Sequence, residues 1–208
     1  MKKIICTPAQ EIEILNKVKD SKFYGNIKSV DNENKVNKFI QKIKNKYYDA
    51  SHNVSAYKLG IGDSALKYSD DDGEPAGSSG PPVLEVIEGK SLTNTVIVIT
   101  RYFGGTKLGI GGLIRAYGNT ARMVIEESGI KKLKLVYTIS LKGKYEIIGN
   151  IMGQIESFNG KILSTDYDNK GGTINAVIKP TNYKKLKNKL IEITGNKVEF
   201  NINKKQYI

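Results

Sequence analysis

The spacing of apolar residues divides the first 130 residues of the chain into strands and helices. Apolar side chains two residues apart predict strands, and apolar side chains three or four residues apart predict helices. The segment 95–102 is nearly all apolar, which is typical of a strand buried on both faces. The pattern predicts strands at 12–18, 23–30, 54–59, 65–68 and 95–102, and helices at 36–47, 83–88 and 114–128.

Residue types at the expected helix ends support these assignments. Asp31 is available as the N-cap of the first helix, because a short acidic side chain accepts hydrogen bonds from unpaired first-turn amides. Gly89 is expected to end the second helix and Gly129 the third. Ile114 and Tyr117 are expected on the buried face of the third helix. The segment 69–82, rich in Gly, Pro and Asp, is predicted to be a loop.

The remaining residues predict a second domain with one strand–helix–strand unit followed by another. Apolar positions alternate at 133–141, follow helical spacing at 145–158 and 183–193, and indicate strands at 162–167, 173–179 and 198–202. The order βαββαβ is the ferredoxin-like plan. The chain is therefore predicted to be an α+β protein with an N-terminal domain at 1–130 and a ferredoxin-like domain at 131–208.

A glycine-rich segment lies between the expected strand at 95–102 and the helix after it. Strand, glycine-rich loop and helix together direct unpaired backbone N–H groups at an anion. All three arginines of the chain, against 30 lysines, lie in residues 98–122. Their forked guanidinium groups favour carboxylate or phosphate. The segment predicts an anion-binding surface; alternatively, its glycines permit close backbone approach and its arginines pair with structural acids. These residues are Gly104, Gly105, Gly109, Gly111, Gly112, Arg101, Arg115 and Arg122.

Other patterns argue against a metal site and against several catalytic classes. The acidic run at 70–74 does not fit the calcium-loop spacing, and one of its acids is expected to face an arginine. His52 is the only histidine and is read, with Asn53, as a hydrogen-bonding structural pair. Cys6, the only cysteine, is placed near a mobile terminus, and no Walker A or GxSxG motif is present. We expect no catalytic residue, no metal and no cofactor.

Charge is distributed unevenly along the chain. The net charge is +12, and residues 130–208 hold 15 Lys and 6 acidic residues, or +9. Such an excess favours a polyanionic partner, although a general bias toward Lys and Asn would produce it too. Lys2 and Lys3 are followed by an apolar run too short for a signal peptide, and no segment is long enough to span a membrane. The expected location is the cytoplasm, with no membrane partner.

Three segments resemble the IMPACT family, and within it the two-domain bacterial branch typified by YigZ. They are ASHNVSAYKLG (50–60), DDGEPAGSSGPPVLEV (71–86) and VITRYFGGTKLGIGGLIRAYGN (98–119). The resemblance covers residues 23–127, and the tail matches the smaller domain of bacterial members. It implies a first domain like domain 2 of ribosomal protein S5 and a tail like a domain of elongation factor G. Eukaryotic members regulate translation during amino-acid starvation, a stress response, through protein contacts.

The residues and the resemblance together predict a non-catalytic cytoplasmic protein that binds RNA, the ribosome or a translation factor and regulates translation. An enzyme acting on a phosphorylated small molecule or nucleotide is one alternative, and a pure protein-interaction module is another. The predicted ligand- or nucleic-acid-binding surface comprises His52, Asn53, Asp71, Asp72, Gly73, Glu74, Pro75, Arg101, Tyr102, Gly104, Gly105, Lys107, Gly109, Gly111, Gly112, Arg115 and Tyr117.

Overall fold

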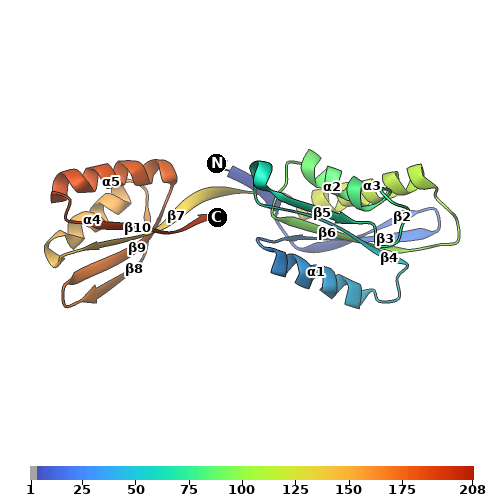
Figure 1. The fold of residues 1–208 in the computed structure, drawn as a ribbon, viewed down its shortest axis with the longest axis horizontal. Helices are drawn as coiled ribbons and strands as arrows, with labels where there is room; N and C mark the ends of the chain where they lie inside the picture. Colours follow the sequence, from blue (N-terminus) through green and yellow to red (C-terminus); the bar gives the residue numbers. More distant parts are fainter. Residues whose placement is uncertain (1–3) are drawn as a thin grey trace. The chain divides into compact units, whose positions relative to one another are not determined.

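A computed structural model describes residues 4–208 (Figure 1). The chain divides into two compact units, Met1–Lys132 and Leu133–Ile208, two residues after the predicted boundary. Lys2 and Lys3, the basic pair noted in the sequence, lie outside the described residues. No helix within residues 4–208 has both the length and the apolar character needed to cross a bilayer.

The first unit is built on a five-stranded antiparallel sheet in the order β2-β3-β6-β4-β5. Helix α1 covers one face of the sheet, and α2 and α3 cover the other (Figure 1). A further strand, β1, precedes the sheet. The elements are β1 (Ile4–Pro8), β2 (Ile12–Val18), β3 (Ser21–Ser29), α1 (Glu33–Lys46), β4 (His52–Leu59), β5 (Leu66–Asp70), α2 (Gly80–Gly89), β6 (Thr95–Tyr102) and α3 (Ile110–Ser128).

The central strand β6 carries the register that positions the site. Its residues Thr95–Arg101 are buried, as expected for a strand with a helix layer on each side. Phe23 of β3 and His52 of β4 both pair with Arg101 of β6. The three side chains therefore form one row across the sheet at the end of β6.

Four local predictions differ from the structure. Asn32, not Asp31, caps α1, because the Asn32 side chain accepts the hydrogen bond from the backbone N–H of Lys35. The C-cap of α2 is Lys90, with Gly89 still inside the helix. Ile114 is 42% exposed, and the neighbouring Leu113 takes the buried position on α3.

The fourth difference concerns the start of the chain. Cys6 lies within β1, and its carbonyl accepts a hydrogen bond from the backbone N–H of Thr93 at 2.9 Å. The apolar run that contains Cys6 is too short to reveal a strand by periodicity. Its partner lies almost ninety residues away, so only the folded chain identifies the pairing.

The second unit has the predicted βαββαβ order, which confirms the α+β class. Its strands form an antiparallel sheet in the order β10-β7-β9-β8. Helices α4 and α5 lie on one face of this sheet (Figure 1). A core of largely aliphatic side chains lies between the helices and the sheet. The elements are β7 (Ile130–Gly143), which begins in the first unit, α4 (Tyr145–Ser157), β8 (Lys161–Asp168), β9 (Gly171–Ile178), α5 (Pro180–Thr194) and β10 (Glu199–Tyr207).

Candidate functional site

A buried ion pair lies at the centre of the predicted surface. Arg101 Nη1 donates to Glu74 Oε1 at 2.7 Å, and the two side chains are 6% and 3% exposed. The Tyr117 hydroxyl donates to the same oxygen at 2.7 Å. Burial, with the Glu74 hydrogen bond adding to it, raises the pKa of Tyr117 above its ordinary value, so the hydroxyl stays protonated. The pair joins β6, α3 and the loop between β5 and α2.

The Arg101 guanidinium is enclosed by protein groups. It lies over the rings of Phe23 and Phe103, 5.5 and 5.4 Å from their centroids. Arg101 Nη2 donates to Ser21 Oγ at 3.4 Å, and Nε has no hydrogen-bond partner within the described chain. The Arg101 guanidinium therefore makes its contacts within the protein. Its role as a hydrogen-bond donor to a ligand stays a prediction.

The two aspartates of the DDGEP loop hold the loop itself. The Asp71 carboxylate accepts hydrogen bonds from the backbone N–H groups of Gly77, Ser79 and Gly80 at 2.7 to 3.0 Å, and from the Ser79 hydroxyl. Burial raises the pKa of Asp71, but these hydrogen bonds outweigh it and the net shift is downward. Asp71 therefore caps α2 from eight residues upstream, where no local capping pattern exists in the sequence.

Asp72 connects the same loop to α1 and β4. Its carboxylate accepts from Lys44 Nζ and from the backbone N–H of Asn53, both at 2.6 Å. Asp72 itself has a positive φ of 47°, and Gly73 follows at 87°. This tight turn, stabilised by these contacts, leads directly to Glu74 at the buried ion pair.

The partly exposed His52 and the buried Asn53 each form hydrogen bonds within the protein, as expected of the structural pair inferred from the sequence. His52 Nδ1 lies 2.8 Å from the Asp72 carbonyl, and because a carbonyl only accepts, Nδ1 carries the proton. Nε2 is then 3.9 Å from Glu74 Oε2. Asn53 Oδ1 accepts from the buried Thr100 hydroxyl at 2.7 Å.

The glycines between β6 and α3 have different roles. Gly104 allows a close approach, because a Cβ there would lie 2.0 Å from the Asp20 carbonyl group. Gly105 and Gly109 have positive φ angles of 95° and 70°, and Gly109 is the N-cap of α3. Gly111 and Gly112 lie in the first turn of α3, where the sequence placed them.

The outward-facing members of the predicted surface include two cations, several glycines and Pro75, and Tyr102 is partly exposed. Lys107 and Arg115 are exposed, and Arg115 lies on the first half of α3. The hydroxyl of Tyr102 donates to Asp49 at 2.6 Å, which raises the pKa of Tyr102 to about 12. Pro75 is exposed, and its carbonyl accepts from Ser78 N at 3.0 Å.

Two tyrosines beside this surface, Tyr24 and Tyr47, were missed by sequence reasoning. Tyr24 of β3 and Tyr47, just after α1, stack with ring centroids 5.1 Å apart, and Tyr24 meets Tyr102 edge to face at 6.0 Å. Phe103 is 49% exposed. The alternation along β3 carried a signal for this cluster, since it places Tyr24 on the face opposite Phe23.

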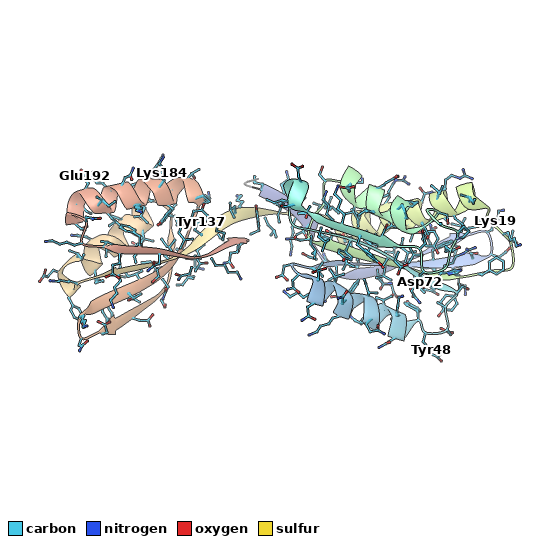
Figure 2. All side chains as sticks on the ribbon, in the orientation of Figure 1. Lys19, Tyr48, Asp72, Tyr137, Lys184 and Glu192 are labelled. Carbon is cyan, nitrogen blue, oxygen red and sulfur yellow. The ribbon has the colours of Figure 1, made fainter. Side chains whose placement is uncertain are left out.

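Figure 2 shows Lys19, Asp72 and Tyr48 toward the same end of the first unit. Lys19 marks the turn between β2 and β3, and Asp72 the loop between β5 and α2. Among residues 4–208, no group of three or more His, Cys, Asp or Glu side chains is arranged to hold a metal ion.

The fold and this site define a class: a two-unit α+β protein whose first unit stabilises a glycine-rich loop with a buried Arg–Glu–Tyr cluster. The model of the Impact N-terminal domain matches residues 19–125, which include nearly all of β3 to α3. The chain belongs to the IMPACT family.

Curated relatives carry the same family name. The chain is 41% identical over 147 residues to the IMPACT family member YvyE of Bacillus subtilis, a match that covers 71% of this chain and 66% of the relative. It is 28% identical to the IMPACT family member YigZ of Escherichia coli, covering 77% and 79%. Protein IMPACT of Danio rerio is 28% identical, covering 60% of this chain and 42% of that protein.

A solved crystal structure of a hypothetical protein shares the fold. Its TM-score is 0.72 at 23% identity, and the superposition covers 98% of this chain and 99% of the other. The likeness concerns the arrangement of elements alone.

Proposed function

We propose that this protein regulates translation in the cytoplasm by binding RNA or a ribosome-associated partner, and that it does so without catalysis. The expected likeness of the first unit to domain 2 of ribosomal protein S5, and of the second to a domain of elongation factor G, belongs to this proposal. Membership of the IMPACT family supports the translational role, because eukaryotic members of that family regulate translation.

The observation that carries the proposal is that the acidic residues of the site are bonded within the protein, whereas its exposed residues are cationic or aromatic. The three acids of the DDGEP loop are all used to hold protein segments: Asp71 caps α2, Asp72 joins α1 and β4, and Glu74 pairs with Arg101. An acid or base for phosphoryl chemistry needs a carboxylate within reach of substrate. The exposed side chains are the cations Lys107 and Arg115 and the neighbouring ring of Phe103, and cations beside an aromatic ring suit a polyanion.

The proposal is tested by thermal shift with three ligand classes on the full chain. A ligand that binds only the folded state raises Tm in proportion to the logarithm of its concentration over Kd. We expect a single-stranded RNA to raise Tm at low salt and the magnesium complexes of ATP and GTP to leave it unchanged. A shift with a magnesium nucleotide and none with RNA would favour the enzyme alternative.

A matched pair of variants separates the surface from general charge. Arg115→Gln removes an exposed cation from the predicted surface, and Lys38→Gln removes an exposed cation from α1. The RNA-induced shift should be smaller for Arg115→Gln than for Lys38→Gln. Equal shifts in the two variants would place RNA binding outside this surface.

A further inference from the structure

A pocket of about 340 Å³ lies on the α1 side of the first sheet, at the end where β6 leaves it. This volume is in the range of small-ligand sites, which begins at about 300 Å³. The pocket is next to the glycine-rich loop. Lys22, Tyr24 and Tyr102 lie on the face of the sheet opposite Arg101, whereas the ring of Phe103, at the end of β6, lies against the Arg101 guanidinium. Its lining residues are Asp20, Lys22, Tyr24, Tyr102 and Phe103.

The aromatic walls of this pocket are held in place by their neighbours. Tyr24 is stacked on Tyr47, and Tyr102 is fixed by the hydrogen bond to Asp49. Phe103 lies against the Arg101 guanidinium, yet the residue is 49% exposed. An aromatic ring fixed in this way offers a face for stacking with little loss of side-chain entropy.

One lysine, Lys22, lines the pocket, and a second lysine lies beside it on the neighbouring strand. Lys17 of β2 lies directly opposite Lys22 of β3, so both side chains project from the same face of the sheet. Like charges in directly opposed positions destabilise a sheet. Both lysines are exposed, and no acid within residues 4–208 forms an ion pair with either. Asp20, which also lines the pocket, accepts a hydrogen bond from the Thr106 hydroxyl at 2.7 Å. A bound anion would offset this repulsion.

We propose that this pocket holds one base of a single-stranded RNA, stacked against Phe103, while Lys17 and Lys22 contact the neighbouring phosphates. This inference rests on the proposed function, and it specifies single-stranded RNA as the partner. Aromatic faces beside cations are the two components of single-strand recognition, because every base has a stacking face and every nucleotide a phosphate. A duplex is a poorer occupant, since its bases are stacked on one another.

A tryptophan reporter tests the stacking directly, because the natural chain contains no tryptophan. Phe103→Trp keeps an aromatic ring at the position and places the sole indole in the pocket. Saturating oligouridylate should quench its fluorescence, whereas heparin, a polyanion without bases, should bind and leave the emission largely unchanged. Binding is followed independently by the anisotropy of a labelled oligouridylate.

Affinity measurements on the full chain use variants with a matched control. Phe103→Leu should weaken oligouridylate binding about fivefold or more, the usual effect of losing one base-stacking ring. Tyr68→Leu, which removes a ring of equal exposure (49%) from β5 at the edge of the sheet, should not. Lys17→Gln and Lys22→Gln should each lower the salt dependence of log K by about 0.7.

The outcomes separate the two proposals. If the natural protein binds no RNA, both fail and the protein-interaction alternative is favoured. If it binds RNA while Phe103→Leu keeps full affinity and the indole of the Phe103→Trp variant is not quenched, the pocket proposal alone is overturned. Should Phe103→Leu fail to fold, as judged by its melting curve, the quenching of the tryptophan variant decides the question.

Discussion

At the scale of single residues, Arg101 connects three segments of the first unit. Its guanidinium bonds to Glu74 in the loop before α2, lies over Phe23 on β3, and shares the Glu74 oxygen with Tyr117 on α3. A buried ion pair tolerates the loss of one partner poorly, because the remaining charge is left without compensation. The stability of this end of the sheet therefore depends on a residue that also looked suited to ligand binding.

Replacing Arg101 tests that role. Arg101→Met leaves the Glu74 carboxylate buried without its cation, and we expect unfolding free energy to fall by about 3–5 kcal/mol. Urea denaturation measures the loss. The control is Arg115→Met on the exposed face of α3, which should change stability by no more than about 0.5 kcal/mol. Similar losses in both variants would contradict a structural role for the buried pair.

Gly104, in the loop after β6, and Gly111, in the first turn of α3, should respond oppositely to alanine. In Gly104→Ala the new Cβ would lie 2.0 Å from the Asp20 carbonyl. The turn between β2 and β3 must therefore move, which should lower the free energy of unfolding by about 1–3 kcal/mol. In Gly111→Ala the nearest atom is Arg115 Nη1 at 3.6 Å, and alanine in the first turn of α3 should stabilise by about 0.5–1 kcal/mol. Thermal unfolding compares the pair, and an unchanged Tm for Gly104→Ala would refute the close approach.

At the scale of elements, the DDGEP loop acts as a remote cap for α2. Ser79, the N-cap residue by position, makes no capping bond with its own side chain. Its hydroxyl instead donates a hydrogen bond to the Asp71 carboxylate, which also accepts hydrogen bonds from the backbone N–H groups of Ser79 and Gly80 at the start of the helix. The loop and the helix therefore fold as one piece.

This cap predicts a pH dependence. The pKa of Asp71 is lowered in the folded protein from its ordinary value of 3.8, so folding favours the ionised form. Its stabilisation is present above that value and is lost as pH falls through the lower, folded pKa. Asp71→Asn should lose about 1 kcal/mol at neutral pH and show a shallower acid decline.

The measurement is a set of urea unfolding curves from neutral to strongly acidic pH. Asp63→Asn is the control, since Asp63 is exposed and makes no comparable set of contacts. An acid decline in Asp71→Asn as steep as that of the natural protein would mean that other carboxyls carry the effect.

At the scale of the whole molecule, positive charge is concentrated in the second unit. The unit Leu133–Ile208 holds 13 Lys and 6 acidic residues, or +7 of the net +12. The lysines of α5 illustrate two situations: Lys189 forms an ion pair with Glu192 at 3.0 Å, whereas Lys184 is exposed (Figure 2). If the second unit contributes to polyanion binding, lysines without an acidic partner contribute most.

The salt dependence of RNA binding measures this contribution. Lys184→Gln should reduce the slope of log K against log salt by about 0.7, the value for one lost phosphate contact on a single strand. Lys189→Gln should change the slope less, because Glu192 already offsets its charge. Slopes that are identical in the natural protein and in both variants would indicate that α5 takes no part in binding.

The amino-acid sequence was sufficient for features that depend on nearby residues. The bounds of β6, the end of α3 at Gly129 and the βαββαβ order of the second unit follow from local periodicity and from glycine at a helix end. The three segments that resemble the IMPACT family could be recognised in the sequence as well, because each is a continuous run of residues. The pattern of residue types did not decide between similar neighbours, such as Asp31 and Asn32 as the N-cap of α1.

Only the tertiary structure decided which way the site residues turn and what they contact. Arg101 and Glu74 have the chemistry of ligand-binding groups, but they pair with each other from segments far apart along the chain. Asp71 binds the start of α2, six to nine residues downstream. The pairing of Lys17 with Lys22 and the meeting of Tyr24 with Tyr102 likewise require the register of β2, β3 and β6. A residue's type limits the interactions it can make, whereas long-range packing determines which of those interactions it makes.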